Sequence, residues 1–531
     1  MKKRENKSPW QNMPLRIAVS GKKAGVLLPA VTSVLIGVFA AIAIPAVMGE
    51  DFAARESAKL YAPLDAWLYD EGSRKYISTV VIDDNSLIQA DQTWPPTYSF
   101  YARLLRGISY YHPKAIFLDV ILTSERNDPS IQRLVDTICK VGAAGARVYL
   151  AASRTPTGSL TLRPELQKVS GHCFTSVSVN YQPDEVDHLT WTYELASSTH
   201  GTVARSAALA IYDDVSGKSL ITPTVPMAIS WGFKPSGHGL RWVSSMSAPP
   251  GAQPDVDASA YCRSPHGALE MLPPGLQRLF HRDAQKPLCV FHDTVYAYDL
   301  ANATPDDDRQ ISASLRDRIV MIGTSRTYTN DFVTSPLHDR IPGVYLHAMA
   351  LDNLLTYGSN YKRAPGLTPT VDVDHYKLLG LGLVSLICVI AFRYIRKSID
   401  AWLIEKIAPP SPPHAPPSKI YLVDTGLFVT SELHQEIQRD LRIKALPASK
   451  QTTSRRRHVT LRALAAFSLK AFFSVIAVAG LLLIGEHMLN IGYFSVISVA
   501  TFSLAAEWFE WNEKLITWLY PEHGNSTHAH N

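Results

Sequence analysis

The chain has 531 residues, of which 46% are hydrophobic and 19% are charged, and its formal net charge is +5 at pH 7. This charge is too small to indicate a nucleic-acid partner, so we expect none. The length suffices for two to four domains, and a charged fraction below the usual value of about 25% indicates that part of the chain lies in lipid.

Four largely apolar segments predict membrane-spanning helices, since a span needs about 20 such residues. They cover residues 24–49, 376–394, 463–485 and 488–506. The first contains no charged residue and follows a basic amino-terminal segment. A cleaved signal peptide is the alternative for this first segment, but its apolar core would have only about 7–15 residues. We therefore expect the chain to contact the lipid bilayer through four helices.

The basic residues around these segments predict how the chain is oriented. Lys and Arg cluster in residues 1–23 and 395–462, and short basic segments stay on the cytoplasmic side. Four spans then place the carboxyl-terminal tail, residues 507–531, in the cytoplasm as well. Residues 50–375 form a large domain on the outer side of the membrane.

Short apolar strands alternate with amphipathic helices in the outer domain. Strands are predicted at residues 78–83, 115–122, 147–152 and 319–322, and helices are predicted after Trp94-Pro95-Pro96 and over residues 130–141. This alternation predicts an α/β fold with a mainly parallel sheet sandwiched by helices. The pattern is weaker in residues 155–310, with candidate strands at 175–179 and 240–244 and a candidate helix at 204–212.

Acidic residues follow the strands of this predicted sheet. Asp83 and Asp84 end the first strand, Asp119 lies in the second, and Asp331 follows the fourth. His347 lies on a helix that starts near residue 344. Because open α/β sheets bind ligands at the carboxyl ends of their strands, we expect these five residues to converge on a ligand or cation site. The alternative is that the carboxylates cap helices and accept from loop amides.

The sequence lacks known catalytic motifs at the ends of its predicted strands. No GxSxG, HExxH, P-loop or GxGxxG sequence follows a predicted strand, so we expect neither an enzyme nor a cofactor. A metal-dependent hydrolase that uses the aspartates is the minor alternative.

Four cysteines lie in the outer domain, namely Cys139, Cys173, Cys262 and Cys289. An extracytoplasmic location permits disulfides, and four cysteines allow three pairings, between which the sequence does not decide. Four free buried thiols are an equally good alternative. No CxxC motif occurs, so the sequence gives no support for a zinc or redox motif.

Four pieces of the outer domain carry a family resemblance. They are VVIDDNSL, the helix that begins with Trp-Pro, PKAIFLDVIL, and the closing RIVMIGTS, NDFVTSPL and PGVYLHAMALDNLL. In this order they resemble a type-2 CHASE domain (CHASE2) over about residues 50–375. In that family the domain is an extracellular sensory module of bacterial signalling proteins, with one span before it and usually three after it. The resemblance therefore implies a multi-pass protein of the bacterial inner membrane, with the large domain in the periplasm.

The cytoplasmic part departs from the family pattern. Residues 395–462 form a long insertion with a proline-rich linker at residues 408–418, and no output domain is recognisable. We therefore predict a membrane sensor whose outer domain senses an unknown periplasmic ligand and relays the signal to a cytoplasmic partner on another chain. A membrane scaffold without a ligand switch is the alternative. The oligomeric state stays open, with a homodimer as one alternative.

Overall fold

The computed structural model describes most of the outer domain, together with short helical segments that precede and follow it in the sequence. The described residues are 65–235 except 186 and 221–224, then 262–263, 288–326 and 331–363, with helical residues within 28–39, 59–63, 383–394 and 503–519. The chain divides into two compact units, of which one contains residues 49–371 and the other contains the described helical residues before and after it. We describe each unit separately.

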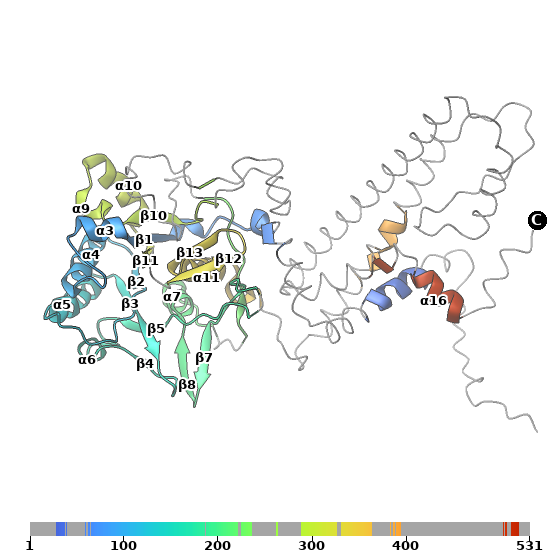
Figure 1. Cartoon of the computed structure of the whole chain (residues 1–531), viewed down its shortest axis with the longest axis horizontal. Coiled ribbons are helices and arrows are strands. Elements are labelled where there is room, and N and C mark those ends of the chain that lie inside the picture. The colour runs from blue at the N-terminus through green and yellow to red at the C-terminus, as the bar shows by residue number, and fades with distance from the viewer. Residues whose placement is uncertain are drawn as a thin grey trace, which may run out of the picture. The chain divides into compact units, whose positions relative to one another are not determined.

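A seven-stranded sheet forms the centre of the outer domain (Figure 1). Its order is β10-β1-β11-β2-β3-β4, and β5 also pairs with β3. The bounds are β1 Ile77–Asp83, β2 Ala115–Leu118, β3 Arg147–Arg154, β4 Leu160–Thr161, β5 Thr175–Ser178, β10 Asp293–Tyr296 and β11 Ile319–Ser325. All pairings are parallel except that of β3 with β4. The prediction of a mainly parallel sheet is therefore confirmed.

Helices cover both faces of this sheet, which explains why its central strands are largely apolar. Figure 1 shows α4 (Tyr98–Tyr110) and α5 (Ile131–Ala143) on one side, and α7 (Ala207–Ser216) and α11 (Val344–Tyr357) on the other. Alternate residues of β1 enter different cores. Val80 and Ile82 pack with α4 and α5, whereas Val81 packs with α7 and α11.

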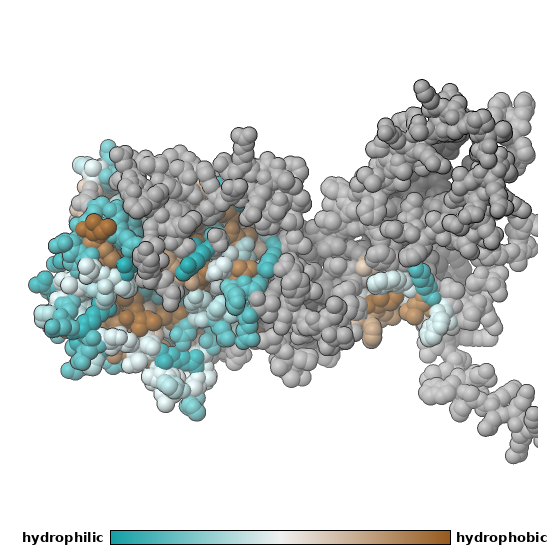
Figure 2. All heavy atoms as spheres, viewed as in Figure 1, coloured by the Kyte–Doolittle hydropathy of each residue, from teal (hydrophilic) through white to brown (hydrophobic). Residues whose placement is uncertain are grey.

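The remaining elements are short and lie around this three-layer core. They are η2 Arg74–Tyr76, α3 Asp84–Gln89, α6 Pro164–Gln167, β6 Thr192–Tyr193, β7 Ala196–Thr199, β8 Thr202–Arg205, β9 Met227–Ala228, α9 Asp299–Asn302, α10 Pro305–Leu315, β12 Phe332–Ser335, β13 Asp339–Pro342 and η6 Gly358–Asn360. In the second unit the structure defines α16 Trp511–Leu519. Figure 2 shows that hydrophilic residues cover much of the described surface of the outer domain on the viewed face, with hydrophobic patches between them.

Two sequence-based boundaries need correction, and one strand was missed. The second predicted strand ends at Leu118 rather than at residue 122, although the Asp119 amide still donates to the Ile322 carbonyl at 2.7 Å. The predicted helix at 204–212 begins only at Ala207, because residues 202–205 pair with β7 and Ser206 caps the helix. The edge strand β10 was not predicted. The candidate strand at residues 240–244 lies outside the described residues.

Membrane helices are not seen in the described part of the chain, where no helix is long and apolar enough to cross a bilayer. The four predicted spans lie mostly or wholly outside the described residues, and they stay predictions. The same holds for the cytoplasmic insertion at residues 395–462.

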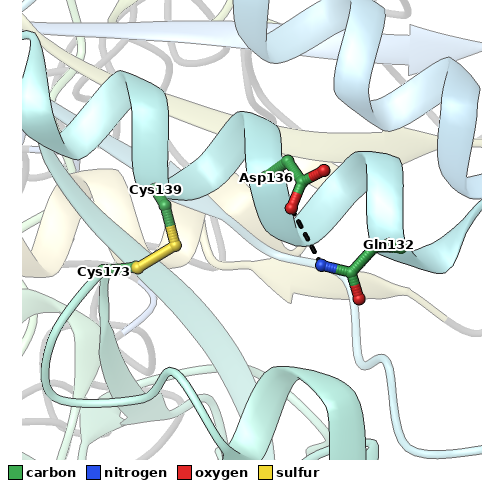
Figure 3. Close-up of a disulfide and its surroundings, with 4 residues drawn as sticks. All are labelled: Gln132, Asp136, Cys139 and Cys173. Carbon is green, nitrogen blue, oxygen red and sulfur yellow. Dashed lines mark hydrogen bonds between the residues drawn. A yellow bond between two sulfur atoms is a disulfide. The ribbon is translucent and has the colours of Figure 1, made fainter.

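The four cysteines of the outer domain form two disulfides, Cys139–Cys173 and Cys262–Cys289. Figure 3 shows the first, which joins α5 to the segment before β5, one turn from the bond between Gln132 and Asp136 on the same helix. The two bridges close loops with sequence separations of 34 and 27 residues. Loops of this size correspond to about 3–4 kcal/mol of stabilisation each.

Candidate functional site

A buried polar cluster lies at the carboxyl edge of the sheet, where ligands bind in open α/β folds. Asp119 directly follows β2, and its alternation with Phe117 places it on the face that α11 covers. His347 is the fourth residue of α11. The Nε2 atom of His347 is 3.6 Å from Oδ2 of Asp119, and both side chains are less than 10% exposed.

Two further groups fix the imidazole of His347. The hydroxyl of Tyr193, on β6, lies 2.8 Å from Nδ1 of His347. The rings of Phe117 and Tyr193 both meet the imidazole edge to face, with centroids 5.5 and 5.6 Å away. Each nitrogen of His347 therefore faces an oxygen atom, while aromatic rings exclude water from the sides.

Asp331 joins this cluster from the segment between β11 and β12. Its Oδ2 accepts a hydrogen bond of 2.6 Å from the hydroxyl of Thr324, at the end of β11. Its backbone carbonyl accepts from the amide of Gly343 at 3.0 Å. A Cβ atom at position 343 would approach Oδ1 of Asp331 to 2.7 Å, so the absence of a side chain there gives Asp331 its place at the start of α11.

Burial dominates the electrostatics of the cluster. It raises the pKa of Asp119 well above the usual range, and the nearby carboxylate of Asp331 raises it further. Burial also raises the pKa of Asp331, although the Thr324 hydroxyl acts in the opposite direction. The same loss of hydration lowers the pKa of His347 to about 3. A charge on any of these groups is therefore costly until a counter-charge arrives.

The cluster is suited to binding a positive charge or a hydrogen-bond donor. Two carboxyl groups close enough to influence each other retain a proton, and a cation or a polar ligand that takes the place of that proton relieves their repulsion. A neutral imidazole beside them is able to accept or donate. The prediction that Asp119, Asp331 and His347 bind a ligand has this physical basis and stays a prediction.

Comparison with known families identifies the domain. A family model for the CHASE2 domain matches residues 39–390, which is more than half of the chain. The chain belongs to the CHASE2 family. Neither curated proteins nor solved structures gave a match. The resemblance found in the sequence is thereby confirmed, and membership in a family of extracytoplasmic sensory domains indicates a sensor in signalling.

Asp83 and Asp84 have other partners in the CHASE2 domain. Asp83 caps α3, where Oδ1 accepts from the amide of Ser86 at 2.8 Å. Asp84 forms an ion pair with Nε of Arg326 at 2.9 Å, and that guanidinium also lies over the ring of Trp94. The alternative that such carboxylates cap helices and bind neighbouring groups thus describes their contacts. These contacts are a helix cap and an ion pair, and neither involves Asp119.

A second polar network of the CHASE2 domain lies at the opposite, amino edge of the sheet. Asp352, one and a half turns after His347 on α11, is fully buried. It accepts from the hydroxyl of Tyr69 at 2.6 Å and lies 3.1 Å from Nε2 of His292, just before β10. Its neighbour Asn353 donates to the Ser230 carbonyl at 2.9 Å and accepts from the Ser230 amide at 3.0 Å.

Sequence reasoning missed most partners of these networks. Tyr193 and Ser230 lie in residues 155–310, where no periodicity marks them, and β6 is only two residues long. His292 precedes an unpredicted strand. The predicted helix that starts near residue 344 contains Asp352 as well as His347. Nothing in the sequence indicated that Asp352 forms a network, or that the two residues serve opposite edges of the sheet.

Proposed function

We propose that this protein is an integral membrane sensor whose extracytoplasmic CHASE2 domain detects a small cationic or hydrogen-bond-donating ligand and passes the signal to its flanking helices. One observation carries the proposal. The helix α11 contributes His347 to the carboxyl-edge cluster and Asp352 to the network at the amino edge. A ligand that displaces α11 at one edge therefore acts on contacts at the other.

The amino edge is where the two ends of the domain meet. Asp65 and Lys362, near the start and the end of the domain, form an ion pair of 2.5 Å in which both side chains are less than 10% exposed. The bond between Tyr69 and Asp352 joins the same two parts of the chain. These contacts tie the segment that enters the domain to the segment that leaves it.

The flanking helices also contact each other within the second unit. Ala30 and Val34 form one hydrophobic cluster with Val389 and Phe392. The amide of Asn512 donates to the Pro29 carbonyl at 3.1 Å. These residues fall in or beside three of the predicted spans, so the proposal places this packing inside or at the surface of the inner membrane.

The proposed output lies on another chain. Residues 395–462 contain a proline-rich linker and no catalytic motif, which favours recruitment of a cytoplasmic partner over an activity of their own. A ligand shifts the helix packing only if it binds one packing more tightly than the other. No enzymatic activity is proposed for the CHASE2 domain.

Cysteine cross-linking of the full chain in native membranes tests the relay. Cysteines at Ala30 and Val389, introduced in a Cys388→Ser background, report how closely the flanking helices pack. We expect Asp119→Asn to change the rate at which this disulfide forms, because it replaces the carboxyl group that lies against His347 on α11. The matched control is Asp306→Asn on α10, whose side chain is 79% exposed.

Two results would contradict the relay. One is an unchanged cross-linking rate in Asp119→Asn while circular dichroism shows an intact fold. The other is an equal change in the Asp306→Asn control. Ligands themselves are sought by thermal-shift screening of the detergent-solubilised chain, where a specific compound stabilises the unmodified protein and fails to stabilise Asp331→Asn.

A further inference from the structure

Two buried histidines of the amino-edge network each have one ring nitrogen without a partner. His292 and His338 are 2% exposed. Within the described part of the chain, Nδ1 of His292 and Nε2 of His338 have no hydrogen-bond partner. A buried nitrogen without a partner costs free energy, so each of these atoms calls for a bound partner.

Both histidines line one small cavity. Its volume of about 10 Å³ is room for the centre of a single water-sized sphere, which corresponds to one water molecule or one ion. Met349, on α11, also lines the cavity, and the other lining residues are aromatic or aliphatic, among them Trp231 and Tyr345. The cavity is thus lined by two histidines and one methionine among aromatic and aliphatic residues.

The second nitrogen of each imidazole is already held by an oxygen atom. Nε2 of His292 lies 3.1 Å from the carboxylate of Asp352, and Nδ1 of His338 lies 3.4 Å from the hydroxyl of Ser335. Metal-binding histidines in proteins are commonly oriented in this way, by a carboxylate or another acceptor on the ring atom that does not bind the metal. The free nitrogen of His292 is then an unprotonated electron-pair donor.

The charges around the cavity favour a single positive charge. Asp352 is completely buried, and its partners are the hydroxyls of Tyr69 and Thr356 and the imidazole of His292. A cation on His292 would offset this carboxylate across the ring.

We propose that His292, His338 and the thioether of Met349 bind one copper(I) ion. Soft thioether ligands select copper(I), and imidazole also suits copper. Zinc is a poorer match, because it requires four ligands and prefers nitrogen, thiolate or carboxylate donors. The described residues contain no group of three or more His, Cys, Asp or Glu side chains placed to hold a metal, so the thioether is what distinguishes this site. The inference does not depend on the relay.

The test is an anaerobic titration of the full chain in detergent with copper(I), in competition with the chromogenic chelator bicinchoninate. The unmodified chain is expected to bind one tight equivalent more than His338→Gln. Met349→Leu keeps the apolar volume and is expected to weaken this equivalent by about tenfold or more. Asp352→Asn removes the group that orients His292 and is expected to weaken binding by about 10–100-fold. The control His172→Gln changes an exposed histidine and should leave binding as it is.

X-ray absorption at the copper edge supplies a second readout. One sulfur scatterer is expected in the unmodified chain and none in Met349→Leu. This separates the site from copper bound by the histidines near the carboxyl terminus, His523, His528 and His530. Equal copper uptake and affinity in the unmodified chain, His338→Gln and Met349→Leu would overturn the proposal. An ordered water in the cavity would then be the partner of the two histidines. Because Met349→Leu is a conservative change, the test survives misfolding of the histidine variants.

Discussion

At the scale of single residues, the buried His347 differs from a surface histidine in how it responds to acid. His347 lies among Phe117, Tyr193 and Asp119, where it has little water to stabilise an imidazolium. Its pKa falls to about 3 in the fold, compared with about 6.5 in the unfolded chain. The buried acid beside it changes in the other direction, since burial raises the pKa of Asp119.

These shifts predict a pH dependence of stability. Between about pH 3 and pH 6.5 the unfolded chain binds a proton at His347 that the folded chain does not, so stability from this residue falls as the pH falls below 6.5. Asp119 has the opposite effect, because the folded state retains its proton to higher pH. Replacement of His347 by Asn isolates the first contribution while Asp119 remains.

We expect the advantage of the unmodified chain over His347→Asn in unfolding free energy to shrink by about 1.4 kcal/mol per pH unit below 6.5. Denaturant unfolding of both proteins in detergent between pH 7.5 and 4.5 measures this difference. A difference that stays constant, or grows in acid, would show that His347 is already charged in the fold and paired with Asp119. His172→Asn, at an exposed site, is the control.

At the scale of elements, capping explains what Asp83 does for the structure. Its carboxylate accepts from the backbone amide at the third position of α3, a helix of only six residues. Asp83→Ala is expected to cost about 1 kcal/mol, and Asp83→Asn, which keeps an accepting oxygen, only a small part of that. Thermal unfolding measures both. A loss in Asp83→Asn as large as that in Asp83→Ala would show that the negative charge itself is needed.

The elements also show which parts of the fold the sequence predicted. Apolar runs bounded by turn residues identified β1, β2, β3 and β11, because parallel strands buried on both faces have a continuous hydrophobic pattern. The strand β10 has the sequence Asp-Thr-Val-Tyr at the edge of the sheet. Its polar side chains bond to distant parts of the chain, as Thr294 does to Thr79 on β1 and to Tyr345 on α11. A local sequence pattern does not reveal such pairings.

The sequence also predicted only part of the candidate site. The rule for carboxyl edges of sheets singled out Asp119, Asp331 and His347, which the structure brings to one cluster. It also singled out Asp83 and Asp84, which the structure uses for a cap and an ion pair. The rule predicts at which edge of the sheet a residue lies, but not which face of the sheet its side chain occupies. Whether an acidic residue finds an amide or a guanidinium partner depends on the loops, and the loops have no periodic sequence pattern.

At the scale of the whole molecule, the ion pair between Asp65 and Lys362 closes the CHASE2 domain at its two ends. Both charges are removed from water, so loss of one partner leaves the other unpaired. Lys362→Met is expected to destabilise the domain by about 3 kcal/mol or more. The double change Asp65→Asn with Lys362→Met should recover most of this loss. Limited proteolysis and thermal unfolding of the full chain compare the three proteins.

An exposed pair provides the control for that experiment. Arg309 and Asp306 on α10 form an ion pair in which both side chains are 79% exposed, and pairs of this kind contribute only about 0–1 kcal/mol. Arg309→Met should therefore leave the unfolding temperature nearly unchanged. If Lys362→Met were equally mild, the two ends of the domain would not depend on each other through this contact, and a mechanical relay through them would lose its support.

The order of strands in the sheet also determines when the domain is able to fold during its synthesis. The first strand of the sheet, residues 77–83, pairs on one side with residues 319–325 and on the other with residues 293–296. Neither neighbour exists until nearly the entire domain has been made. If the domain is translocated as proposed, its amino-terminal half crosses the membrane without the partners that complete its hydrophobic core. Long-range pairing of this kind folds slowly and leaves apolar strands exposed in the meantime, so production of the protein should depend on periplasmic chaperones that hold unfolded chains.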